Sequence, residues 1–263
     1  MPTRRTRLFM LSCLLWLYSL TALAAGQVLH VATRPGVQHS LLWWPAPAAS
    51  ATVLLFPGGN GGFGRVRDGV PDGDNFLVRA TPLLVAQGLN VAIFGRPDDG
   101  SGLGYEARID APHVADIGAV LAEVRRRAGQ PPWLVGTSRG TLSATAAAIA
   151  LQAQVAGLIL SSSVVGRNKP GAVPTQDLAA IRLPVLLIHH RRDACPVCRP
   201  ADVPALLAQF SQARDKQLQW LDGGGPSHGK VCGAWHWHGY NGIEDQAVAA
   251  MTGWIRAHPA PAP

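Results

Sequence analysis

A serine placed between two glycines carries the strongest chemical signal in the sequence. The run Gly136-Thr137-Ser138-Arg139-Gly140 has the pattern G-x-S-x-G, with an apolar stretch before it and an alanine-rich stretch after it. A serine on a sharp strand-to-helix turn has a strained backbone, and the two glycines remove side chains that would collide. Ser138 is therefore expected to be an exposed nucleophile, with the backbone N–H of Arg139 facing the oxyanion of a reacting carbonyl. The alternative is a serine that only caps a helix.

The elements around this serine alternate between short apolar runs and segments with helical spacing. Strands are expected over 28–32, 39–44, 52–56, 90–94, 132–137, 155–162, 183–189 and 217–221, and helices over 76–87, 113–128, 139–152, 203–213 and 243–257. Such alternation predicts right-handed strand–helix–strand units, a mainly parallel sheet and helices on both of its faces.

The chain resembles the compact dienelactone-hydrolase or cutinase-like members of the α/β-hydrolase superfamily over nearly all of its length after residue 24. The loop Leu55-Phe56-Pro57-Gly58-Gly59-Asn60-Gly61-Gly62 follows a predicted buried strand, where such enzymes place a glycine-rich oxyanion loop. The resemblance implies that Gly59 or Asn60 donates the second oxyanion hydrogen bond. The alternatives are a flexible turn and a phosphate-binding loop, but the Lys-Ser/Thr pair of phosphate-binding loops is missing and no helix is expected directly after the glycines. Only a short Gly/Pro-rich connection spans 163–181, so no large lid domain is expected.

The resemblance also implies an acid and a base. The run from Leu183 to Asp193 is similar to the family segment P-V-L-x-I-H-G-x-x-D, with His190 in place of the usual glycine, which makes Asp193 the expected acid. A turn-forming role is the alternative for Asp193, and Asp202 is the second candidate for the acid. Three histidines (His228, His236 and His238) compete for the role of base. His238 is favoured because its distance from the final predicted helix is the one usual in the family, but His228 stays open, since only geometry identifies a triad.

The cysteines allow two interpretations. A Cys195–Cys232 disulfide would connect the acid loop to the base loop, as the resemblance to some cutinase-like enzymes implies, with Cys198 as the spare thiol or the other partner. A zinc site is the alternative, because three cysteines and the histidines around His238 offer enough donors. Export favours disulfides. No metal and no cofactor are therefore expected.

The N-terminal residues have the composition of a secretory signal. Arg4, Arg5 and Arg7 precede an apolar run that ends in Ala22-Leu23-Ala24, which predicts a signal peptide over 1–24, although an uncleaved anchor stays possible. The expected location is the periplasm or the medium, with no membrane association after cleavage. Residues 25–258 form the expected hydrolase domain, and 259–263 a flexible tail.

Composition limits the partners that the chain can have. The sequence has 263 residues, 48% of them hydrophobic and 15% charged, which suits one large globular domain. The net charge of +7 comes from scattered basic residues, so nucleic-acid binding is not expected. The expected function is hydrolysis of small or accessible esters through an acyl-enzyme; a non-catalytic secreted binding protein and a zinc-dependent hydrolase are the alternatives. The sequence gives no indication of acyl specificity or oligomeric state.

Overall fold

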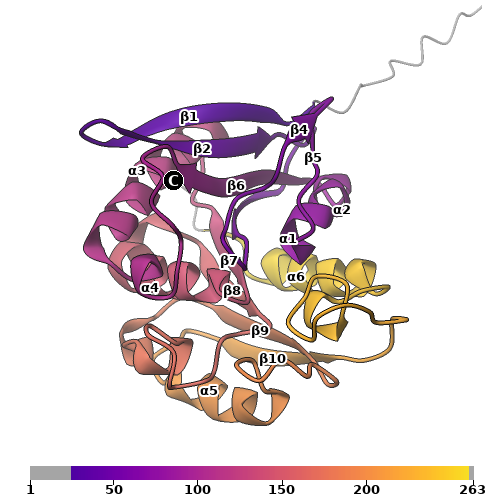
Figure 1. The fold of residues 1–263 in the computed structure, drawn as a ribbon. Helices are drawn as coiled ribbons and strands as arrows, with labels where there is room; N and C mark the ends of the chain where they lie inside the picture. Colours follow the sequence, from indigo (N-terminus) through magenta and orange to yellow (C-terminus); the bar gives the residue numbers. More distant parts are fainter. Residues whose placement is uncertain (1–24, 261–263) are drawn as a thin grey trace, which may run out of the picture.

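The structure is a computed structural model that describes residues 25–260, and its centre is an eight-stranded sheet (Figure 1). The strands of this sheet are β1 (Gln27–Arg34), β2 (Val37–Trp44), β3 (Ala51–Phe56), β6 (Leu89–Pro97), β7 (Trp133–Thr137), β8 (Gly157–Ser161), β9 (Val185–His190) and β10 (Lys216–Leu221). Their order is β1-β2-β6-β3-β7-β8-β9-β10. β1 and β2 are antiparallel to their neighbours, and the strands from β6 to β10 run parallel. All eight strands expected from the sequence are present, with ends shifted by a few residues.

Helices cover both faces of the sheet, as predicted. The helices α3 (Ala111–Ala128), α4 (Gly140–Leu151) and α5 (Val203–Gln209) pack on one face, and α1 (Phe76–Arg79), α2 (Thr81–Ala86) and α6 (Glu244–Ala257) pack on the other (Figure 1). Successive side chains of β3 point to opposite faces, so Leu54 belongs to one core cluster and Leu55 to the other. This double burial explains why the central strands read as continuous apolar runs.

The expected helix over 76–87 is two helices, which corrects the prediction from spacing. α1 ends at Arg79 and α2 begins at Thr81, with Pro82 in its first turn. Proline has no backbone N–H, so Pro82 cannot donate the i→i−4 hydrogen bond that one continuous helix would need at this position. The sequence analysis also missed a small hairpin of β4 (Val66–Arg67) and β5 (Val70–Pro71), and α5 ends four residues before the predicted end at 213.

The connections bear on access to the site. Between β8 and β9 the chain forms only two short 3-10 helices, Val173–Thr175 and Leu178–Ala180, and no lid domain. The proposed signal peptide over 1–24 and residues 261–263 lie outside the described part of the chain. Ala260, in the predicted tail, packs against the core cluster of α6. Within residues 25–260, no helix is both long enough and apolar enough to span a membrane.

Candidate active site

Ser138 lies on a tight turn between β7 and α4. Its φ angle is +51°, in the left-handed region that a residue with a side chain seldom adopts. The surroundings require glycine on both sides of it: a Cβ on Gly136 would be 2.7 Å from the carbonyl oxygen of Gly140, and one on Gly140 would collide with the carbonyl of Phe56. The Ser138 N–H donates to the oxygen of Ser161 at 3.1 Å, which connects the turn to β8. The G-x-S-x-G pattern thus corresponds to a constrained turn that presents the serine above the sheet.

His238 and Asp193 form a buried hydrogen-bonded pair. Nδ1 of His238 lies 2.8 Å from Oδ2 of Asp193, and the two residues are 5% and 4% exposed. Oδ1 of Asp193 accepts a hydrogen bond from the N–H of Cys195 at 2.9 Å, and Nε2 of His189 lies 3.4 Å from Oδ2. Burial alone would raise the pKa of Asp193, but the hydrogen bonds and charges of His189 and His238 outweigh it and lower the pKa to about 2. The carboxylate is therefore charged at neutral pH and can hold the imidazole in one tautomer.

The other ring nitrogen of His238, Nε2, is buried and has no hydrogen-bond partner among residues 25–260. Ser138 and His238 line the same cavity of about 190 Å³, and no hydrogen bond joins them in this structure. A histidine that shares a cavity with a serine, with Nε2 free and Nδ1 held by a carboxylate, is suited to general-base catalysis.

Two residues that the sequence analysis missed hold the histidine's backbone. The Ser162 hydroxyl donates to the carbonyl oxygen of His238 at 2.8 Å. The Tyr240 hydroxyl lies 3.1 Å from Ser162 Oγ and donates to the oxygen of Ile188 at 2.9 Å. Burial raises the pKa of Tyr240, so it remains a neutral donor. Both residues have positive φ angles in a structure where most such residues are glycine, and no sequence pattern marks them.

The competing candidates lie elsewhere. His228 is exposed and stacks on Trp235, with ring centroids 6.1 Å apart, and it makes no contact with Asp193. Asp202 pairs with Arg199 at the surface. Among the residues weighed as acid and base, the structure brings only Asp193 and His238 together.

The two candidates for the second oxyanion donor, Gly59 and Asn60, line different hollows in the structure. Gly59 lines the cavity of Ser138, whereas Asn60 lines a different hollow beside Arg96. The backbone N–H groups of Gly59 and Arg139 donate to no residue within 25–260, so both are available to an incoming oxygen.

A buried arginine fixes the loop that carries Gly59, and the sequence analysis did not identify it. Nη2 of Arg108 donates to the carbonyl oxygens of Pro57 at 3.2 Å and Gly59 at 3.3 Å. Its Nε donates to Leu103 O at 3.2 Å, and Nη1 to Ser143 Oγ at 3.0 Å. Arg108 is 1% exposed, and within the described chain no carboxylate lies within salt-bridge distance of it. An arginine in a polar connection has no local signature that could have revealed this role.

The carbonyl of Gly58, which lies between those of Pro57 and Gly59, is also held. Its oxygen accepts a hydrogen bond from the N–H of Gly61 at 3.0 Å. Since a trans peptide points its N–H opposite to its carbonyl, holding three successive carbonyls also fixes the direction of the Gly59 N–H. Burial, with the nearby charges of Arg139 and Arg96, lowers the pKa of Arg108 to about 9.

Cys195 and Cys232 form a disulfide, the pairing that the family resemblance implied. The bond connects the loop after β9 with the loop before α6, and Cys232 lines the cavity of Ser138. Cys198 is a buried free thiol. Burial and the charge of Asp193 raise its pKa well above the usual range, against a smaller opposite effect of a hydrogen bond with Ser138.

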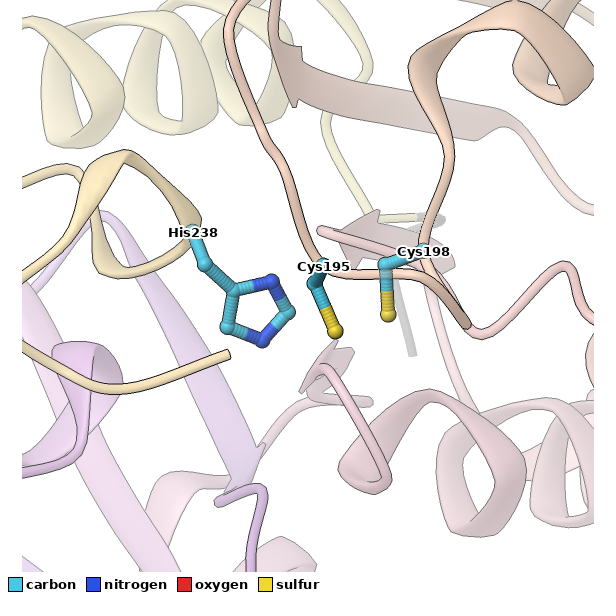
Figure 2. A group of neighbouring side chains, drawn as sticks. All are labelled: Cys195, Cys198 and His238. Carbon is cyan, nitrogen blue, oxygen red and sulfur yellow. The ribbon is translucent and has the colours of Figure 1, made fainter. Parts of the chain in front are cut away.

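The donor set for zinc is incomplete. The donor atoms of Cys195, Cys198 and His238 lie within 4.8 Å of one another (Figure 2). However, Cys195 Sγ is bonded to Cys232, and only a free thiolate binds zinc well. In the described chain, neither His228 nor His236 joins this group, so the residues that the zinc interpretation needs are not assembled.

Solved structures provide a comparison for this geometry. A lidless α/β serine hydrolase from Xanthomonas campestris is 20% identical, with a TM-score of 0.63 over 91% of this chain and 97% of that one. An esterase from Pyrococcus furiosus is 14% identical, with a TM-score of 0.63 over 89% and 93% of the two chains. An α/β serine hydrolase homologue from Coxiella burnetii is 17% identical, with a TM-score of 0.58 over 90% and 99%. No protein-family model and no curated protein sequence matched the chain. The structural likeness shows that the chain has the α/β-hydrolase fold.

Proposed function

We propose that the chain is a serine hydrolase that cleaves carboxylic esters, with Ser138 as nucleophile, His238 as base and Asp193 as the orienting acid. One observation carries this proposal: Nε2 of His238 is unpartnered and shares a cavity with Ser138, while Asp193 holds Nδ1 at 2.8 Å. The order Ser, Asp, His along the chain is the order usual in this fold. The solved esterases of similar fold support the same reaction class.

The reaction follows from these positions. Nε2 of His238 accepts the hydroxyl proton of Ser138 as Oγ attacks the carbonyl carbon of the ester. Asp193 stabilises the resulting imidazolium. The N–H groups of Gly59 and Arg139 bind the oxyanion of the tetrahedral intermediate. The imidazolium then protonates the leaving alkoxide, and a water activated by His238 hydrolyses the acyl-enzyme.

The size of the cavity favours a small acyl group. Its volume of about 190 Å³ is below the range of about 300–1,000 Å³ that is usual for pockets enclosing a drug-sized ligand. Gly58, Gly59 and Gly239 form part of its wall. The short connection between β8 and β9 leaves the opening uncovered by a lid. Esters of short carboxylic acids, including those on the end of a larger molecule, fit this shape.

We also propose that the protein is exported. The basic and apolar composition of residues 4–24 supports a cleaved leader, and the Cys195–Cys232 disulfide suits an oxidising compartment. N-terminal sequencing of the protein recovered from the periplasm of an expressing bacterium tests this. A mature chain that begins at Ala25 is expected; protein found only in the cytoplasm with its leader intact would contradict export.

Labelling with a fluorophosphonate tests the proposed activity. The mature wild-type protein and Ser138→Ala are treated in parallel, the labelled peptide is mapped, and turnover of p-nitrophenyl acetate is measured. We expect one label per chain on Ser138, and neither label nor turnover in the variant. A wild-type protein without label or turnover would favour a binding protein on this scaffold. Turnover that survives in Ser138→Ala and is lost with a chelator would favour the zinc-dependent alternative.

A further inference from the structure

Asn75 lines the same cavity as Ser138 and His238, and none of the catalytic roles above involves it. It directly precedes α1 as the N-cap residue. Its side-chain Oδ1 accepts a hydrogen bond from the N–H of Leu77 at 3.1 Å. α1 and α4 lie on opposite faces of the sheet (Figure 1).

The cap determines the orientation of the amide. Only the oxygen of an asparagine amide can accept a hydrogen bond from a backbone N–H, so the position of Nδ2 follows from the contact with Leu77. Nδ2 is a donor that has no acceptor within the part of the chain that the structure describes. Because Oδ1 is already held, rotating the amide away from the cavity would cost the capping bond.

Nδ2 of Asn75 and Cβ of Ser138 both border the space beside Gly58. A Cβ placed on Gly58 would be 2.8 Å from Cβ of Ser138 and 3.3 Å from Nδ2 of Asn75. The glycine therefore keeps open the space between the amide and the nucleophile. A carbonyl oxygen that enters this space from a substrate meets a neutral donor whose direction is already set.

We propose that Asn75 is a further catalytic residue, whose side-chain Nδ2–H donates a hydrogen bond to the carbonyl oxygen of the substrate as negative charge develops on it. The proposal rests on the acyl-transfer function proposed above. Asn75 adds a side-chain donor to the backbone N–H groups of Gly59 and Arg139. A preorganised donor stabilises the transition state without reorganisation during the reaction, and loss of one such donor lowers kcat by about 10²–10³ in other hydrolases.

Three substitutions of Asn75 distinguish its role as a hydrogen-bond donor to the substrate from its role as the N-cap of α1. Serine and aspartate cap helices about as well as asparagine, so Asn75→Ser and Asn75→Asp keep the acceptor for Leu77 N–H and lose the amide donor. Asn75→Ala loses both. The readouts are kcat and KM for p-nitrophenyl acetate across a pH series and the thermal midpoint of unfolding.

We expect kcat to fall about 100-fold in Asn75→Ser and further in Asn75→Asp, because a carboxylate opposes the oxyanion. KM and the thermal midpoint should stay close to those of the wild type in both, whereas Asn75→Ala should also melt at a lower temperature. If Asn75 is only a cap, Asn75→Ser retains the wild-type kcat and Asn75→Ala is impaired, while Asn75→Asp is slowed by its charge alone. That result would overturn the proposal.

Labelling of the wild-type protein distinguishes this failure from failure of the proposed function. A wild type that is labelled at Ser138 and turns over ester, beside an equally active Asn75→Ser, removes only the role of Asn75. A wild type that is neither labelled nor active removes both.

Discussion

Nδ1 of His238 lies 2.8 Å from Oδ2 of Asp193 although 45 positions separate the two residues in the sequence. The bond joins the loop after β9 to the 3-10 turn Trp237–Gly239 before α6. It orients the imidazole toward the cavity of Ser138, and the contact distinguishes His238 from the other histidines of the same loop.

Replacement of His238 is expected to remove activity, whereas replacement of His228 is not. His238→Ala should lower kcat by about 10⁴ or more, because the serine loses its base. His228→Ala should stay within about threefold of the wild type, since His228 is exposed and its ring stacks on Trp235. Steady-state kinetics of both variants on one ester measures this. An inactive His228→Ala beside an active His238→Ala would reverse the assignment.

Acid should remove a contribution of Asp193 to stability. Its pKa is about 2 in the folded protein against an ordinary value of 3.8. A folded pKa below the unfolded one means that the contribution is present above about pH 4 and is lost as the pH falls toward about 2. The contribution at neutral pH is about 2 kcal/mol.

Urea unfolding of the wild type and of Asp193→Asn between pH 6 and pH 2 measures this loss. Because asparagine does not titrate, the difference between the two free energies of unfolding should shrink by about 2 kcal/mol over that range. A difference that stays constant with pH would mean that the carboxylate is not stabilised by its histidine partners.

Removal of the disulfide should lower stability and loosen the acid loop. The Cys195–Cys232 bond closes a segment with a sequence separation of 37, and loss of such a constraint costs about 2–4 kcal/mol. In the variant in which both cysteines are serine, we expect a lower free energy of unfolding in urea. We also expect a reduced kcat, because Asp193 accepts its hydrogen bond from the N–H of Cys195.

A reducing agent provides the control for this prediction. Reductant should lower the urea midpoint of the wild type toward that of the double variant and leave the double variant itself unchanged. If reductant shifts both proteins equally, the bond is not the source of the effect.

Arg108→Met should reduce activity more than stability. Methionine removes a buried cation that has no carboxylate partner among residues 25–260, which is favourable, but it leaves the carbonyls of Pro57 and Gly59 without their donor, which is unfavourable. We therefore expect the free energy of unfolding to change by less than about 2 kcal/mol. The peptides on either side of the one that carries the Gly59 N–H lose their donor, although Gly61 still holds Gly58 O, so the direction of this N–H is less well fixed. We therefore expect kcat to fall about 10- to 100-fold, with a smaller change in KM.

Urea unfolding and steady-state kinetics of Arg108→Met and Arg108→Gln test this expectation. Glutamine retains one amide donor and no charge, so partial recovery of kcat is expected. A folded Arg108→Met with the wild-type kcat would show that the loop holds its conformation without the arginine.

Local sequence patterns were sufficient for the fold class and for the nucleophile. Buried parallel strands are continuous apolar runs, so β3, β7 and β9 could be identified from the sequence without knowing their neighbours. The turn at Ser138 is local in part, because Gly136 is needed by the backbone of Gly140 and Thr141, whereas Gly140 is needed by the carbonyl of Phe56 in β3. The spacing could not show the break between α1 and α2, since an apolar helical pattern continues across Pro82.

Only the tertiary structure could decide which of the candidate site residues, far apart in the sequence, lie together. Which histidine meets Asp193 depends on how the loop before α6 returns to the end of β9, and hydrophobic periodicity carries no information about that path. Asn75, directly before α1, lines the cavity of Ser138, and Arg108, in the connection between β6 and α3, donates hydrogen bonds to the loop after β3. A contact between side chains far apart in the sequence depends on the packing of whole elements, whereas a turn or a buried strand depends on its neighbours along the chain.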